Sequence, residues 1–237
     1  MCNEGASGEV SSEILRGVDY WHVVAASVRG TSHQKRQQPC QDAHYWGTVH
    51  DDVLVAAVAD GASSAALGKV GATLAVCAAA TTVCARHQRT VCPENDAAWR
   101  QWLVDAMRAA QATVVAEAQA RQVTVRELAT TLILVVAMPA RVAVAQIGDG
   151  AVVVSDMAGN LFPLTVLQHG EYPNESNILV TDTALVTLVD TDSFQVREPH
   201  NGGVYRCPVG KPEFTPLNSR AALFHRSTAR QNMTSLA

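Results

Sequence analysis

The stretch VLVAAVADGASSA, residues 53–65, decides how this chain folds. Residues 53–59 are all Val, Leu or Ala, and a short apolar run without polar alternation predicts a strand that is covered on both faces. Asp60 ends that run, and Gly61 then lets the backbone turn and approach a ligand. A carboxylate at the end of a buried strand is a place where a hard cation can bind. The alternative is an ordinary Asp-Gly turn, and these residues alone favour it, because Asp-Gly is common in turns.

The composition indicates one good-sized folded domain. The chain has 237 residues, of which 48% are hydrophobic and 17% charged, which argues against a disordered protein. Its net charge of −4 argues against non-specific nucleic-acid binding as a main role. The apolar runs are too short to span a membrane, and the first residues lack the pattern of a secretory signal. We therefore expect a cytoplasmic location, no membrane partner, and cysteines that stay reduced.

The order of the predicted elements indicates an α+β fold. Strands are expected over 20–28, 42–49 and 53–59, with a polar, basic loop at 30–41 between the first two. Two helices follow, over 64–87 and from an N-cap at Asn95 or Asp96 to Arg121. Strands then return at 128–138, 141–147, 151–156 and 161–167. Runs of strands on either side of a block of helices predict antiparallel sheets with the helices packed outside.

Acidic residues recur at the ends of these strands. Gly148-Asp149-Gly150 follows the strand at 141–147 much as Asp60-Gly61 follows its own, and Asp42 comes directly after the basic loop. Carboxylates gathered at one rim of a sheet, without a histidine cluster, suit Mg²⁺ or Mn²⁺ rather than zinc. A pair of such ions can activate a water molecule and bind a phosphoryl group.

These segments resemble, in order and spacing, the PPM-type metal-dependent serine/threonine protein phosphatases, and most closely their bacterial branch. The motifs that carry the resemblance are Gly30-Thr31-Ser32-His33, Gln41-Asp42-Ala43, Val58-Ala59-Asp60-Gly61-Ala62, Thr130-Thr131 and Ile147-Gly148-Asp149-Gly150. No single motif is specific, but the ordered set is a much stronger signal. The resemblance covers about residues 20–175 and implies an α-β-β-α sandwich of two antiparallel sheets flanked by helices.

The resemblance also implies roles for individual residues. Asp60 would be the catalytic residue that bridges two Mg or Mn ions, and the Gly61 carbonyl would complete one coordination shell. Asp149 matches an acid associated with a further metal ion. Asp42 matches an acid that supports these ligands, with Gln41 beside it where the family usually has a carboxylate.

The phosphate-binding residue of the family has no direct counterpart here. The family usually has an arginine at the position of Gln37. Lys35 or Arg36 would therefore have to reach the phosphate. The alternative is that both belong to a solvated basic loop, and we weigh the two interpretations evenly.

The family pattern stops in the last third of the chain. A Thr/Ser-Asp-Gly motif and a closing Asp-Asn motif, both sources of metal ligands, are not found, so this third is expected to be incomplete. Residues 177–216 instead resemble a protein-kinase fragment, in which Asn177 and Asp190, thirteen positions apart, match metal-binding residues. Tyr172 stands where the kinase's catalytic Asp belongs, and no glycine-rich loop precedes it, so phosphoryl transfer from ATP is not expected. The alternative is two short strands, at 178–181 and 184–189.

Four segments follow from this interpretation. They are a lead-in at 1–19, a partial phosphatase domain at 20–175, a kinase-like fragment at 176–216 and a disordered tail at 217–237. The function implied is hydrolysis of phosphoserine or phosphothreonine by metal-activated water, with a phosphoprotein as substrate and a serine/threonine kinase as a partner. The rival hypotheses are an inactive phosphatase-like interaction module and a kinase-like pseudoenzyme.

Overall fold

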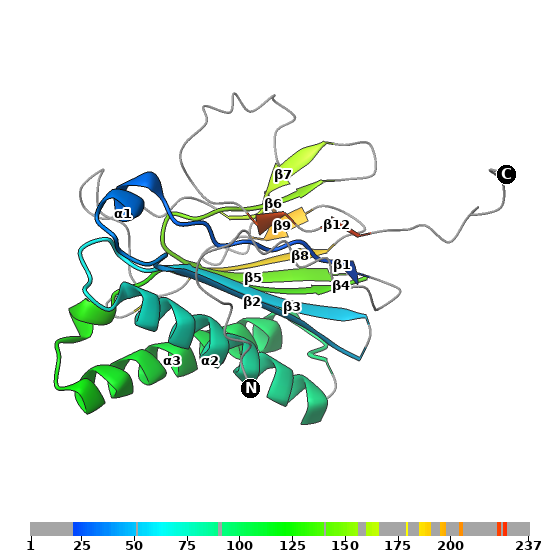
Figure 1. The fold of residues 1–237 in the computed structure, drawn as a ribbon. Helices are drawn as coiled ribbons and strands as arrows, with labels where there is room; N and C mark the ends of the chain where they lie inside the picture. Colours follow the sequence, from blue (N-terminus) through cyan, green and yellow to red (C-terminus); the bar gives the residue numbers. More distant parts are fainter. Residues whose placement is uncertain are drawn as a thin grey trace, which may run out of the picture.

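The structure, a computed structural model, describes residues 21–50, 52–89, 92–139, 141–155, 160–165, 179, 185–190, 195–197, 204–205, 222–223 and 225–226. Figure 1 shows the arrangement of its elements. The helices are α1 (Thr31–Lys35), α2 (Gly68–Arg89), α3 (Asp96–Arg121) and the 3₁₀ helix η1 (Val125–Leu128). The strands up to β7 are β1 (Trp21–His22), β2 (Asp42–Val49), β3 (Val53–Asp60), β4 (Leu132–Met138), β5 (Arg141–Ile147), β6 (Val152–Ser155) and β7 (Leu161–Pro163). The later strands are β8 (Leu185–Asp190), β9 (Gln195–Arg197), β10 (Val204–Tyr205), β11 (Ala222–Leu223) and β12 (His225–Arg226).

One large antiparallel sheet organises the molecule. Its strand order is β10-β9-β8-β5-β4-β3-β2, so the apolar strand β3 lies inside the sheet with a partner on each side. β3 is covered on both faces, as its uninterrupted Val, Leu and Ala sequence predicts. A smaller sheet has the order β11-β6-β7, and β1 pairs with β12. The predicted α+β class is confirmed.

The two long helices pack on the same face of the large sheet (Figure 1). Small side chains at Ala72, Ala75 and Ala79 of α2 are fully buried, which lets this helix approach the sheet closely. α3 contributes larger side chains, such as Trp99 and Leu103. By length and composition alone α2 could also cross a membrane, but its apolar side chains are used in this core.

The opposite face of the large sheet carries a smaller core. Alternate residues of β3 and β4 point to this side, among them Leu54, Ile133 and Val135. They pack with Trp21 from the N-terminal segment and Val152 from β6. In Figure 1 the strands β6 and β7 lie on this side, away from the helices. The two faces of one sheet therefore contribute to two separate cores.

Several predicted boundaries were wrong in the first half of the chain. The strand expected over 20–28 is only β1, because Val24 and Val28 continue as exposed, irregular chain. The loop expected at 30–41 contains α1, which begins where the amide of Gln34 donates to the Gly30 carbonyl. The helix expected from residue 64 begins at Gly68, since the preceding segment is bonded to residues 127 and 129 instead.

The later elements follow the prediction more closely. The Asn95 N-cap is confirmed, as its side chain accepts a 2.9 Å hydrogen bond from the amide of Ala98. The strand expected over 128–138 begins only at Leu132, because residues 130 and 131 bond to Asp60. The hairpin of β4 with β5 is confirmed. β8 matches the alternative prediction of a strand at 184–189, and it extends the large sheet beside β5.

Candidate metal centre

Asp60 and Asp42 face each other across two neighbouring strands. They are direct Cα partners in the antiparallel pair of β2 and β3. Side chains of directly opposite residues lie on the same face, with Cβ atoms about 5 Å apart. Because Leu54 and Val58 of β3 contribute to the smaller core, the alternation of the strand puts Asp60 on that same side, away from the long helices. The register therefore places two acidic residues side by side on one face of the sheet, at the end of β3.

The backbone of Asp60 is fixed by two threonines. Its amide donates to the Thr131 hydroxyl over 3.0 Å, and its carbonyl accepts from the Thr131 amide over 2.9 Å. The hydroxyl of the fully buried Thr130 donates to the same carbonyl over 3.0 Å. These three bonds hold the end of β3 rigidly, so the position of the Asp60 carboxylate is determined by the fold.

Gly61 is required by the packing of the loop that follows. A Cβ atom on Gly61 would overlap the backbone of Gly68, at the start of α2. Main chain cannot move as readily as the end of a side chain, so only glycine fits here. The Gly61 amide donates to the Gln41 carbonyl over 3.1 Å, which ties the turn back to the start of β2. The role of the Gly61 carbonyl as a metal ligand stays a prediction.

Asp149 lies in a glycine turn at the same end of the sheet. β5 ends at Ile147, which pairs with the first residue of β4, and the turn begins directly after it. Gly148 has a φ of 113°, a conformation that favours glycine. Asp149 itself is exposed, whereas Gly148 is buried. The turn thus holds a solvent-accessible carboxylate beside the end of β3.

The electrostatics link Asp60 to Asp149. The pKa of Asp60 is raised above its ordinary value of 3.8, first because surrounding atoms displace water from its carboxylate and then because of the negative charge of Asp149. His33, on α1, lowers the pKa of Asp60 and so acts in the opposite direction. Groups from β3, from the turn after β5 and from α1 therefore share one electrostatic environment. Asp60 and Asp149 both have a predicted metal role. His33 has none, although its motif is part of the resemblance.

Gln41 turns toward a different neighbour. It is buried, with 7% of its surface exposed, and its Nε2 donates to the Ala65 carbonyl over 3.4 Å. The structure thus connects Gln41 to the loop that follows Gly61. Asp42, the next residue, accepts a 3.5 Å hydrogen bond from the Cys40 thiol at Oδ2. The supporting roles expected of Gln41 and Asp42 stay predictions.

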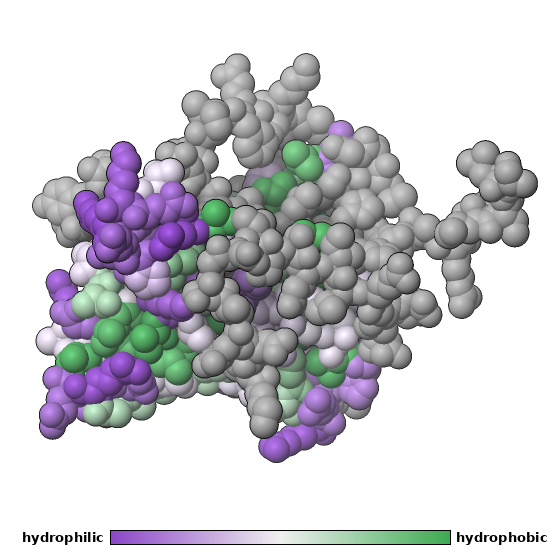
Figure 2. Space-filling view, viewed as in Figure 1, coloured by the Kyte–Doolittle hydropathy of each residue, from purple (hydrophilic) through white to green (hydrophobic). Residues whose placement is uncertain are grey.

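Lys35 and Arg36 lie at the end of α1, and both are exposed. Figure 2 shows hydrophilic side chains gathered at this end of the molecule, over α1. Neither residue takes part in an ion pair within the described part of the chain. The geometry leaves both predicted roles open, as phosphate ligands or as a solvated basic loop.

The two residues of the kinase-like resemblance, Asn177 and Asp190, differ in what the structure says of them. Asn177 lies outside the described residues. Asp190 is the last residue of β8, where it is the Cα partner of Arg141 in the large sheet. The backbone of Asp190 therefore continues the large sheet. A kinase-like role for this segment stays a prediction without support from the structure. Two short strands, β11 and β12, lie within the tail expected to be disordered.

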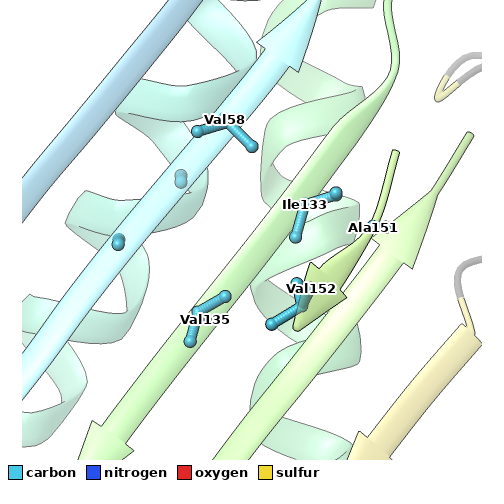
Figure 3. A pocket seen from close by; sticks show the side chains of 7 residues that line it. Val58, Ile133, Val135, Ala151 and Val152 are labelled. Carbon is cyan, nitrogen blue, oxygen red and sulfur yellow. The ribbon is translucent and has the colours of Figure 1, made fainter. Parts of the chain in front are cut away.

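A small apolar pocket lies next to the acidic residues. It is lined by Ala56, Ala57, Val58, Ile133, Val135, Ala151 and Val152. Figure 3 shows Val58, Ile133 and Val135 on β3 and β4, with Val152 on the neighbouring β6. With no polar side chain in its lining, this pocket cannot bind a phosphate group. The polar chemistry is confined to the strand ends beyond Val58.

The donors at these strand ends fit a hard divalent cation. Carboxylate oxygens are the ligands that Mg²⁺ and Mn²⁺ prefer, and Mg²⁺ commonly binds to one or two protein carboxylates with water in its other positions. A cation bound between Asp60 and Asp149 would balance their charges and lower the pKa of Asp60 again. Within the described part of the chain, no three His, Cys, Asp or Glu side chains group closely enough to hold a metal.

Comparison with known proteins agrees with this architecture. The family model for protein phosphatase 2C matches residues 29–207, a span that includes the start of the supposed kinase-like fragment and β8. Serine/threonine-protein phosphatase 3 of Escherichia coli (strain K12) is 34% identical over 175 residues, which cover 72% of this chain and 67% of that protein.

Solved structures show the same fold. A bacterial serine phosphatase superposes with a TM-score of 0.52 at 12% identity, over 65% of this chain and 69% of its own. The serine/threonine phosphatase Stp1 from Staphylococcus aureus gives 0.52 at 13% identity, over 65% and 67% of the two chains. The chain belongs to the protein phosphatase 2C family, the PPM-type serine/threonine phosphatases.

Proposed function

We propose that this chain hydrolyses phosphoserine and phosphothreonine in a phosphoprotein, with Mg²⁺ or Mn²⁺ bound at the strand ends. The observation that carries the proposal is the pairing of Asp42 with Asp60, together with the charge of Asp149 beside Asp60. The negative charge of Asp149 opposes ionisation of Asp60, and a divalent cation bound between them would remove that cost.

Each residue has a defined part in this proposal. Asp60 binds the ions, with two expected as in the family, and Asp149 contributes charge from the turn after β5. Thr130 and Thr131 keep the Asp60 backbone in place. Lys35 or Arg36 orients the phosphate of the substrate. Bound metal would supply an activated water molecule and would neutralise the charge that develops on the phosphoryl oxygens.

The wider biological setting is also proposed. A cytoplasmic protein with a phosphoprotein substrate would reverse the action of a serine/threonine kinase, which is a signalling role. The kinase-like interpretation of 176–216 is left out of this proposal, because the family match runs through residue 207 and β8 joins the large sheet.

The second candidate function is an inactive phosphatase-like interaction module. One observation favours it: the described residues hold no group of three metal-binding side chains. Such a module would still bind a phosphoprotein or a kinase, but without turnover. Family membership is the same for both candidates, so only a measurement of activity separates them.

The experiment is Mn²⁺-dependent hydrolysis of a phosphothreonine peptide by the purified chain. We expect turnover that requires added Mn²⁺ and falls at least about 100-fold in Asp60→Asn, since metal-centred stabilisation of the reaction is lost. Asp105→Asn, which changes an acid on α3, is the matched control and should retain activity. Equal rates for the wild-type chain and Asp60→Asn would leave the interaction module as the better account.

A further inference from the structure

Gln146 is a buried polar side chain that the sequence motifs do not single out. Only 2% of its surface is exposed, although it lies on β5 among apolar neighbours. Its Cα partners are Ile133 on β4 and Leu185 on β8. A buried amide is costly unless it is hydrogen-bonded, so its partners indicate why it stands here.

Both hydrogen-bond acceptors of the Gln146 side chain belong to the turn that carries Asp149. Its Nε2 donates to the Gly148 carbonyl over 2.9 Å and to the Gly150 carbonyl over 2.6 Å. The two hydrogen bonds therefore bracket Asp149, one on each side. An amide nitrogen with two hydrogens can satisfy two carbonyls at once, whereas a carboxylate or an apolar side chain cannot.

The orientation of the Gln146 amide follows from these contacts. Because both facing groups are carbonyl acceptors, the nitrogen and not the oxygen must point into the turn. Its Oε1 is buried and has no hydrogen-bond partner among the described residues. The Oε1 atom therefore remains without a hydrogen bond among the described residues, whereas the two bonds from Nε2 hold the turn in one conformation.

The face on which Gln146 lies connects it to the metal centre. Val144, two residues earlier on β5, contributes to the same smaller core as Val58 of β3, so Gln146 and Asp60 lie on the same side of the sheet. The turn that carries Asp149 begins at the same end of the sheet as Asp60, since Ile147 pairs with Leu132 and the Thr131 amide donates to the Asp60 carbonyl. Any movement of the turn would change the separation of these two carboxylates.

We propose that Gln146 is a positioning residue of the metal centre, which clamps the Gly148-Asp149-Gly150 turn so that Asp149 shares a cation with Asp60. This inference rests on the proposed function, because it concerns how that site is built. Gln146 acts through Asp149 and makes no contact with the substrate.

The test is a direct measurement of Mn²⁺ binding, in which electron paramagnetic resonance reports the concentration of free Mn²⁺. Gln146→Met keeps the volume of the side chain and removes both donated bonds. We expect its Kd for Mn²⁺ to rise by about 10- to 100-fold, as for other residues that orient metal ligands. The matched control is Gln101→Met, which removes a 2.7 Å bond to Asp105 within α3 and should leave the Kd unchanged. The start of α3 lies at the other end of β5 from the turn, because Asp96 forms an ion pair with Arg141.

A second measurement needs no metal. In the metal-free protein, hydrogen exchange of residues 148–152 should be faster in Gln146→Met than in the wild type or in Gln101→Met. If Gln146→Met is insoluble, Gln146→Asn, which keeps the amide but is too short to reach both carbonyls, should show the same two effects.

The outcomes separate the inference from the proposed function. A wild-type Mn²⁺ affinity in Gln146→Met, even with a lower Tm, would overturn the positioning role and leave the phosphatase proposal intact. Absence of Mn²⁺ binding by the wild-type chain would overturn both the metal centre and this role within it. In that case hydrogen exchange would still decide whether Gln146 clamps the turn.

Discussion

The two faces of the large sheet differ in what they contribute. The helix-covered face forms a large core with fully buried side chains such as Leu103 and Leu134. The opposite face has a smaller core and ends in facing carboxylates, Asp42 and Asp60. The larger share of the stability therefore comes from the helix-covered side, and the candidate chemistry lies on the other side of the same strands. Substitutions in the helix-covered core should leave metal binding largely unchanged.

The strongest test of this division uses two adjacent residues of β4. Leu134 points into the helix-covered core and is fully buried, whereas Ile133 points into the smaller core and lines the apolar pocket. We expect Leu134→Ala to lower the free energy of unfolding by about 3–4 kcal/mol and Ile133→Ala by about 2 kcal/mol, because the cost rises with the completeness of the packing. Urea denaturation measures both. Equal losses would show that the two cores are equally well packed.

A smaller effect is expected from the charge of Asp60. Its pKa is raised in the folded protein, so ionisation of Asp60 opposes folding when no metal is bound. Protonated Asp60 should therefore favour the folded state of the metal-free chain at low pH. This contribution to stability is lost as the pH rises from 3.8 through the raised pKa. Asp60→Asn should remove that pH dependence without loss of stability, as measured by thermal unfolding of metal-free protein across this range. A variant that is less stable than the wild type at neutral pH would contradict the account.

The smallest effect is expected on the helix side. Arg86 and Asp105 form a 2.7 Å ion pair, and Arg86 also lies over the ring of Trp102 at 4.9 Å. The hydrogen bond from Arg86 lowers the pKa of Asp105, so this stabilisation is present above 3.8 and is lost as the pH falls through the lowered pKa. Both side chains are more than a third exposed, and after solvent screening Asp105→Asn should cost only about 0.5 kcal/mol. A loss above about 1 kcal/mol in chemical denaturation would show a larger structural role.

Sequence patterns predicted the parts of the fold that depend on local chemistry. The apolar run of β3, the Asn95 cap and the β4–β5 hairpin all follow from short-range rules. The starts of α2 and β4 did not, because residues 60–67 and 127–131 bond to each other across the chain rather than continuing their own element. Hydrogen bonds between distant segments leave no periodic signal.

The candidate site shows the same limit. Asp60 and Asp149 were found because an acid beside glycine at a strand end is a visible pattern, supported by the order of the motifs. Gln146 was missed, since a single polar residue within a strand looks like any other. Its signal was present in the sequence RVAVAQI, where one amide interrupts an apolar strand just before the turn. Only the hydrogen bonds to Gly148 and Gly150 give that interruption a meaning.

The most direct test of the central claim is whether Asp60 and Asp149 bind the same cation. Equilibrium Mn²⁺ binding should be measured for the wild-type chain, Asp60→Asn, Asp149→Asn and the double variant, with Asp105→Asn as control. Each single substitution should weaken binding by at least about tenfold, and the double variant should be little worse than the weaker single one, because residues that share a ligand are not additive. Wild-type affinity in either single variant, or fully additive losses, would contradict a shared metal centre.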